Sequence, residues 1–130
     1  MLGDLRFGRF WLVFGWLAVV AALVLSLLPP KAVDIPGAND KLEHLIGYLL
    51  LTFWFCGLYP RRRYALIALG MLAMGGLVEV LQAAMHLGRQ AELGDLIADS
   101  MGIALAVILA MTPLGRWPRW FEILFQKNLP

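Results

Sequence analysis

The sequence predicts an all-α, polytopic membrane protein with four transmembrane helices and a C-terminal amphipathic helix at the membrane interface. Of the 130 residues, 61% are hydrophobic and 15% are charged. In a typical soluble domain, about 45–50% of the residues are apolar and about 25% are charged. The block from residue 10 to residue 28 has no charged side chain, and the block from 64 to 85 has only Glu79. Apolar blocks of about 18 or more residues are typical of transmembrane helices.

Four spans account for most of the chain. They are predicted at residues 10–28, 42–59, 64–85 and 95–112, with Pro29, Pro60 and Pro113 after the first, second and fourth. Proline ends helices because it lacks a backbone N–H and clashes with the preceding turn. Since one span takes about 20 residues, residues 1–130 form one membrane domain. We expect no separate soluble domain and no cleaved signal peptide.

The C-terminal tail, from Arg116 to Lys127, has a different pattern. Its apolar residues recur at helical spacing, opposite the polar residues Arg119, Glu122 and Gln126; they are Trp117, Trp120, Phe121 and Leu124. An amphipathic helix with tryptophans on one face is typical of the headgroup region of a membrane.

The distribution of Lys and Arg predicts the orientation. Eight of the 11 fall on one side of the predicted spans: Arg6, Arg9, Arg61, Arg62, Arg63, Arg116, Arg119 and Lys127. The other three are Lys31, Lys41 and Arg89. The richer side is expected to be cytoplasmic, which places both termini in the cytoplasm. Seven of the nine acidic residues lie at or toward the outer side, and this indicates a polar site there.

Three predicted helices carry polar residues on one face near their outer ends. The stripes are Asp40, His44 and Tyr48; Glu79, Gln82 and His86; and Asp95, Asp99 and Gly102. Spacings of three and four residues place side chains on one face of a helix. Because a charge facing lipid is costly, Glu79 and Asp99 should face the bundle interior. Lys41 and Arg89 are the expected counter-charges.

Ordinary structural roles are alternatives for several of these residues. Asp40 with Glu43 resembles a capping box, and Asp95 is a plausible N-cap of the fourth span. His44 and Tyr48 could be interfacial residues, and His86 a solvated loop residue. Glu79 lies too far inside its span to cap it, so its structural alternative is a hydrogen bond with Gln82. Gly70, Gly75 and Gly76 would allow a close approach of the third helix to a neighbour.

The order of these motifs resembles that of the VanZ-like membrane protein family. The resemblance covers about residues 40–102 and rests on the elements Asp40-Lys41-x-x-His44-x-x-x-Tyr48, Glu79-x-x-Gln82, Arg89 and Asp95-x-x-x-Asp99-x-x-Gly102. It implies a small protein of the bacterial cytoplasmic (inner) membrane that is associated with glycopeptide, especially teicoplanin, susceptibility. The family more often has Asn at the position of Asp99.

Three functions are consistent with these patterns. The first is binding or modulation of a cell-envelope component at an outward-facing polar site. The second is an intramembrane enzyme acting on a lipid-linked or phosphate-containing envelope substrate. In that case His44, Glu79 and Asp95 are the candidate catalytic residues, and the candidate substrate-binding residues are Asp40, Lys41, Tyr48, Gln82, Arg89 and Asp99. The third, a small transporter, is suggested by the intramembrane acids alone.

The expected partners are membrane lipids and a lipid-linked envelope precursor. The basic residues are explained by membrane orientation, so they indicate no nucleic-acid binding. The mixture of Asp, Glu and His could also hold a divalent metal ion, although no motif names one. Cys56 is the single cysteine, and it is interpreted as a small apolar packing residue.

Overall fold

Every regular element in the described part of the computed structural model is a helix. The structure describes residues 2–29, 39–86 and 91–127. The long helices are α1 (Gly8–Leu27), α2 (Asp40–Leu58), α3 (Tyr64–Met85), α4 (Leu93–Met111) and α5 (Trp117–Lys127). Short 3₁₀ helices lie at Leu2–Asp4 (η1), Arg61–Arg63 (η3) and Pro113–Arg116 (η4). The all-α prediction is confirmed for these residues.

The helix boundaries differ from the predicted ones by at most two residues. The third predicted helix coincides with α3, whereas α2 and α4 each begin two residues before the predicted spans. Asn39, and not Asp40, caps α2, because its side-chain oxygen accepts a hydrogen bond from the backbone N–H of Lys41 at 3.1 Å. The N-cap of α4 is Glu92, which places Asp95 inside the first turn. Neither proposed N-cap role applies, because the N-caps of the two helices are Asn39 and Glu92.

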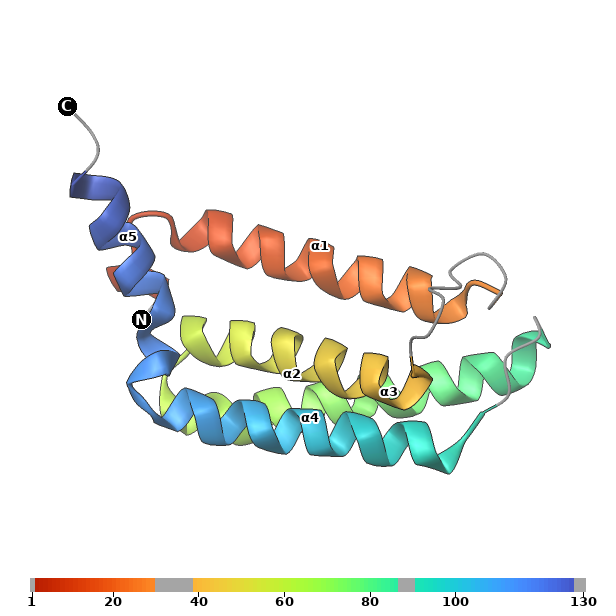
Figure 1. The fold of residues 1–130 in the computed structure, drawn as a ribbon. Coiled ribbons are helices and arrows are strands. Elements are labelled where there is room, and N and C mark those ends of the chain that lie inside the picture. Colours follow the sequence, from red (N-terminus) through yellow and green to blue (C-terminus); the bar gives the residue numbers. More distant parts are fainter. Residues whose placement is uncertain (1, 30–38, 87–90, 128–130) are drawn as a thin grey trace.

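The four helices α1 to α4 lie alongside one another, each roughly antiparallel to the next (Figure 1). We call the end where α1 and α3 finish and α2 and α4 begin the polar end, and the opposite end the aromatic end. The closest packing is between α2 and α4, at Gly102 of α4. A Cβ atom built on Gly102 would overlap the carbonyl oxygen of Leu45 in α2. Only glycine permits this approach of the two backbones.

Large apolar side chains cover the outside of the bundle. Examples from three helices are Phe10, Leu17, Leu69, Val80 and Ile108, all at least 60% exposed. A soluble monomer rarely exposes so continuous an apolar surface. Among the described residues, three helical segments are long and apolar enough to cross a membrane: Gly8–Leu27, Arg61–Met85 and Leu93–Met111. Helix α2 is less apolar because Asp40, Lys41 and Glu43 occupy its first turn.

Helix α5 is held against the start of α1 at the aromatic end. The Glu122 carboxylate accepts hydrogen bonds from the backbone N–H groups of Arg6 and Phe7 at 3.0 and 2.9 Å, and from Trp11 Nε1 at 3.3 Å. The Glu122 carboxylate thus provides acceptors for backbone N–H groups at the start of α1. Its negative charge also interacts favourably with the positive end of the α1 helix dipole. The predicted amphipathic helix is present, but Glu122 is buried against the protein and does not lie on a solvated face.

Aromatic rings fill the space between α5 and the bundle. The ring centroids of Trp54 and Trp117 are 4.5 Å apart, and those of Trp11 and Trp117 are 5.4 Å apart. Trp54 Nε1 also donates a hydrogen bond to the carbonyl oxygen of Trp11 at 3.0 Å. These contacts join α1, α2 and α5 at the end of the molecule opposite the polar site.

The contact at Gly102 predicts the effect of adding one methyl group. Gly102→Ala should lower the melting temperature in detergent, because overpacking costs about 1–3 kcal/mol and here the obstacle is backbone. Gly76→Ala in α3 is the matched control, since a Cβ atom there meets nothing within 4 Å. The control should be neutral or slightly stabilising, because alanine favours helix over glycine by about 1 kcal/mol. Equal melting temperatures for the two variants would contradict the close α2–α4 contact.

Candidate functional site

His44 lies at the centre of the polar end, between two acidic residues of α4. Its Nδ1 is 2.8 Å from Asp99 Oδ1, and its Nε2 is 3.9 Å from Asp95 Oδ2. The three side chains are at most 7% exposed. They meet because His44 is one turn into α2, while Asp95 and Asp99 are one turn apart on the face of α4 that Gly102 brings against α2. The polar stripes predicted on the second and fourth helices therefore meet.

The hydrogen bond to Asp99 determines which nitrogen of His44 carries a proton. An ionised carboxylate only accepts hydrogen bonds, so Nδ1 donates to it. In the neutral imidazole of this tautomer, Nε2 carries the lone pair, and it lies 3.9 Å from Asp95 Oδ2. Each buried group lowers the cost of burying the other, and removal of one partner from such a pair typically costs about 3–5 kcal/mol.

Lys41 is the observed counter-charge at the edge of the site. Its Nζ is 2.9 Å from Glu92 Oε2 and 3.7 Å from Asp95 Oδ1. The hydrogen bond and the charge of Lys41 lower the pKa of Glu92. Arg89, the other predicted counter-charge, lies outside the described residues.

Helix α3 contributes Glu79, which is joined to the start of α4. Glu79 Oε2 accepts a hydrogen bond from the backbone N–H of Glu92 at 2.8 Å. Gly75, one turn earlier, lies beside Asp99, because a Cβ atom on Gly75 would come within 2.7 Å of Asp99 Oδ2. The expected close approach of the third helix thus occurs at Gly75, but Gly70 and Gly76 have nothing within 4 Å of a built Cβ atom.

Two residues of the predicted third-helix stripe have other partners. Gln82 is buried, and its Nε2 donates a hydrogen bond at 2.9 Å to the carbonyl oxygen of Ser26 at the end of α1. His86 is exposed in a left-handed conformation after α3, and its Nδ1 lies 2.9 Å from the carbonyl oxygen of Ala84. Its exposed position fits the alternative interpretation of His86 as a solvated loop residue. No hydrogen bond joins Glu79 to Gln82 among those described.

Several buried oxygen atoms at the polar end have no hydrogen-bond partner within the described part of the chain. They are Glu79 Oε1, Gln82 Oε1, Asp95 Oδ1 and Asp99 Oδ2. Buried acceptors normally have partners, and an exception at a cluster indicates a water, an ion or a ligand. Three of these four oxygens belong to carboxyl groups. The electrostatic character of this end therefore favours a cation or a hydrogen-bond donor.

A pocket of about 250 Å³ opens between α1 and α2, next to His44; its lining is largely apolar but includes the ionisable side chains of α2, and we call it the polar pocket for that reason. Asp40, His44 and Tyr48 line its α2 side, so the first predicted stripe borders one cavity; Leu25 and Ser26 line its α1 side. Asp40, His44 and Asp95 each also offer a ligand atom, with all three atoms within 4.8 Å of one another. Tyr48 contributes little surface to the pocket, because only 6% of the residue is exposed.

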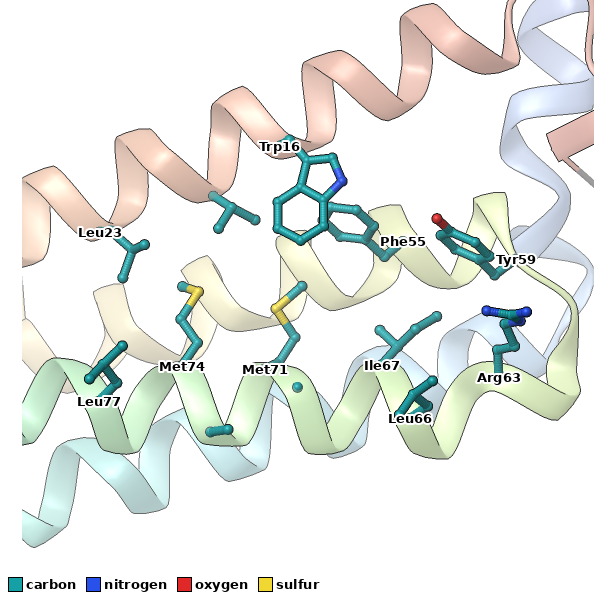
Figure 2. Close-up of a pocket in the computed structure, with 13 residues that line it drawn as sticks. Trp16, Leu23, Phe55, Tyr59, Arg63, Leu66, Ile67, Met71, Met74 and Leu77 are labelled. Atoms are coloured by element: carbon teal, nitrogen blue, oxygen red, sulfur yellow. The ribbon is translucent and has the colours of Figure 1, made fainter.

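An apolar groove of about 650 Å³ lies beside the polar pocket, between α1 and α3. Figure 2 shows Trp16 and Leu23 of α1 facing Met71, Met74 and Leu77 of α3, with Phe55 of α2 behind them. Met74 lines both the groove and the polar pocket. The two cavities are therefore neighbours, and together they extend along the bundle from the polar end.

Sequence reasoning missed the roles of Glu92 and Ser26. Glu92 is one of the seven acidic residues assigned above to the outer side, and in the structure its side chain contacts Lys41 and its backbone N–H bonds to Glu79. Its position immediately before α4 was the available signal, because residues at helix starts offer free N–H groups. Ser26 is the one polar residue in its apolar block, but the role of its carbonyl oxygen leaves no pattern in sequence.

No family model, curated protein or solved structure matches this chain.

The Lys41–Glu92 pair predicts a pH-dependent contribution to stability. The pKa of Glu92 is lowered from its ordinary value of 4.5, so the pair stabilises the fold above that pH. The contribution is lost as the pH falls through the lower, folded-state pKa. Thermal melting of wild type and Glu92→Gln should therefore differ slightly at neutral pH and converge in acid, and high salt should reduce the difference.

The matched control for this measurement is Glu43→Gln, which removes another exposed carboxyl group from the first turn of α2. A difference between wild type and Glu92→Gln that does not change with pH would contradict an ionic contribution from Glu92.

Proposed function

We propose that this chain is a four-span protein of the bacterial cytoplasmic membrane that binds an amphiphilic component of the cell envelope. The observation that supports this is the adjacency of the polar pocket and the apolar groove, which meet at Met74. An envelope lipid or lipid-linked precursor has both a polar head and a long apolar chain. The sequence resemblance to the VanZ-like family favours the same class of ligand and a role in glycopeptide susceptibility.

Helix α2 is the proposed fourth span. Its 19 residues reach about 28 Å at about 1.5 Å per residue, close to the thickness of the hydrocarbon core. The polar first turn would lie at the outer interface, where charged side chains reach water. Helix α5 would lie at the inner interface, with Trp120 and Leu124 exposed toward the lipid, and both termini would be cytoplasmic.

The two cavities match the two parts of such a ligand. The groove volume of about 650 Å³ lies within the usual range for ligand sites, about 300–1,000 Å³. Its lining includes Trp16, Leu23 and Met71, which suit an acyl or isoprenoid chain. The polar pocket offers carboxylates, an imidazole and a phenol to the headgroup. Specificity for one ligand over another would depend on the polar pocket, because apolar chains are recognised mainly by shape.

A second candidate function is hydrolysis or transfer at the headgroup, and the position of His44 favours it. His44 borders the polar pocket, and Asp99 holds its ring so that Nε2 is available as a general base. In this arrangement Asp99 orients the His44 ring, and Asp95 is the second carboxyl group beside it. Glu79 does not touch His44 but positions the start of α4 by accepting a hydrogen bond from the backbone of Glu92. Arg89 remains a proposed phosphate-binding residue.

The proposed orientation can be tested by cysteine labelling. In a Cys56→Ala background, a cysteine at Ala91 should react with a membrane-impermeant maleimide in intact cells. A cysteine at Arg62 should react only after the membrane is opened. Both positions are exposed and lie at opposite ends of the bundle. Labelling of Arg62→Cys but not Ala91→Cys in intact cells would reverse the proposed topology.

Ligand binding can be tested by filling the apolar groove. Gly70 lines the groove, and a built Cβ atom there meets nothing within 4 Å, so Gly70→Leu should place a side chain in the cavity without disturbing the helix. Native mass spectrometry with an undecaprenyl-pyrophosphoryl disaccharide pentapeptide, and separately with teicoplanin, should give a bound complex with wild type. Gly70→Leu should weaken binding at least tenfold, equivalent to about 1.4 kcal/mol.

The control is Gly76→Leu, which adds the same side chain to α3 at an open position that does not line the groove. It should bind the probes as wild type does. Failure of both probes to bind more tightly than phosphatidylglycerol would refute the proposed function. Equal weakening by the two leucines would place the ligand elsewhere.

A further inference from the structure

We propose that Asp40, His44 and Asp95 form a binding site for a divalent transition-metal ion. One ligand atom from each side chain lies within 4.8 Å of the other two. Two residues come from α2 and one from α4, so an ion would join the two helices that pack most closely. Asp40 is exposed while His44 and Asp95 are buried, which places the site at the edge of the bundle, accessible from water.

The orientation of His44 is the first argument for this site. Metal-binding histidines usually donate their second ring N–H to a carboxylate or a carbonyl, which fixes the tautomer and directs the lone pair at the metal. Here Nδ1 lies 2.8 Å from Asp99 Oδ1, and Asp99 is 1% exposed. The remaining nitrogen, Nε2, is the one that lies 3.9 Å from Asp95 Oδ2. Asp99 is thus a positioning residue for the proposed ligand His44.

The state of Asp95 is a second, independent argument. Its side chain is 4% exposed, and its buried Oδ1 has no hydrogen-bond partner among the described residues. A buried carboxylate left in this state is costly, because few groups replace the water that it loses. A metal ion bound between Asp95, His44 and Asp40 would give this carboxylate a direct partner.

Lys41 is the competing cation at this site. Its Nζ lies 3.7 Å from Asp95 Oδ1, too far for a hydrogen bond, and its shorter contact is with the exposed carboxylate of Glu92. The Lys41 side chain is long, flexible and 52% exposed, so its ammonium group can remain on Glu92 when an ion binds. Removal of the Lys41 charge should therefore strengthen metal binding, because a positive charge near the site opposes a second one.

The donor set indicates the class of metal. One imidazole nitrogen and two carboxylate oxygens suit Zn²⁺ or Mn²⁺ better than Ca²⁺, which prefers six to eight oxygen ligands. The general order of affinities predicts tighter binding of Zn²⁺ than of Mn²⁺. Three protein ligands leave coordination positions for water or for an oxygen atom of a ligand. The ion would bind to the protein alone, so it can be tested without the proposed envelope ligand, although Asp40 and His44 also line the polar pocket. An ion on Nε2 would exclude that nitrogen as a general base.

The site can be tested with Mn²⁺ and Zn²⁺ on the full chain in detergent, without any lipid probe. Mn²⁺ binding measured by electron paramagnetic resonance should give one ion per chain, displaced by Zn²⁺. Pulsed measurements should detect coupling to a histidine nitrogen that His44→Gln abolishes. Asp40→Asn, Asp95→Asn and His44→Gln should each weaken Mn²⁺ binding at least tenfold. Asp99→Asn should weaken it about tenfold through the orientation of His44, and Lys41→Met should strengthen it.

Glu43→Gln is the matched control, because Glu43 is an exposed acid in the same turn as Asp40 but outside the three ligands. It should leave Mn²⁺ affinity unchanged. Circular dichroism should show wild-type helicity for Asp40→Asn, since Asp40 is exposed, so this variant decides the matter even if buried variants fail to fold. Absence of Mn²⁺ and Zn²⁺ binding, or binding unaffected by Asp40→Asn and without nitrogen coupling, would overturn the proposal.

Discussion

Burial of charge inside an apolar bundle is the constraint on which the rest of this structure depends. Asp95, Asp99 and Glu79 lie inside a molecule whose outer surface is largely apolar, and an ionised carboxylate in such surroundings needs compensation. The compensation comes from neighbouring helices: His44 for Asp99, and the backbone of Glu92 for Glu79. The polar residues therefore determine how α2, α3 and α4 are placed at this end.

Small residues make these contacts possible. Gly102 lets the backbone of α2 lie against α4, and Gly75 leaves room for the Asp99 carboxylate beside α3. A larger side chain at either position would separate the groups that compensate one another. Interhelical packing and polar pairing are thus one arrangement, because hydrogen bonds between helices require the backbones to approach closely.

The two ends of the bundle use carboxylates for different purposes. At the aromatic end, Glu122 accepts three hydrogen bonds and secures α5 to the start of α1. At the polar end, one buried oxygen each of Glu79, Asp95 and Asp99 has no hydrogen-bond partner within the residues that the structure describes. A carboxylate whose oxygens both accept hydrogen bonds from the protein has a structural role. A group of carboxylates with unpartnered oxygens is suited to binding a cation or a hydrogen-bond donor. This contrast favours the polar end as the candidate site, and the apolar groove runs toward that end from Tyr59 and Arg63 near the aromatic end (Figure 2).

The sequence alone determined the helical class and the approximate limits of each long helix, because apolar blocks, proline stops and the period of the helix are local properties. It also predicted that His44, Asp95 and Asp99 would lie near one another, since their spacing sets the helix face and their position sets the depth. It did not determine which partners they would choose. Gln82 bonds to Ser26 instead of Glu79, and Glu122 turns inward to the start of α1. These pairings depend on the rotation and separation of the helices, which only packing at residues such as Gly102 and Trp117 decides. The groove between α1 and α3 likewise arises from helices distant in sequence, so no local pattern could predict it.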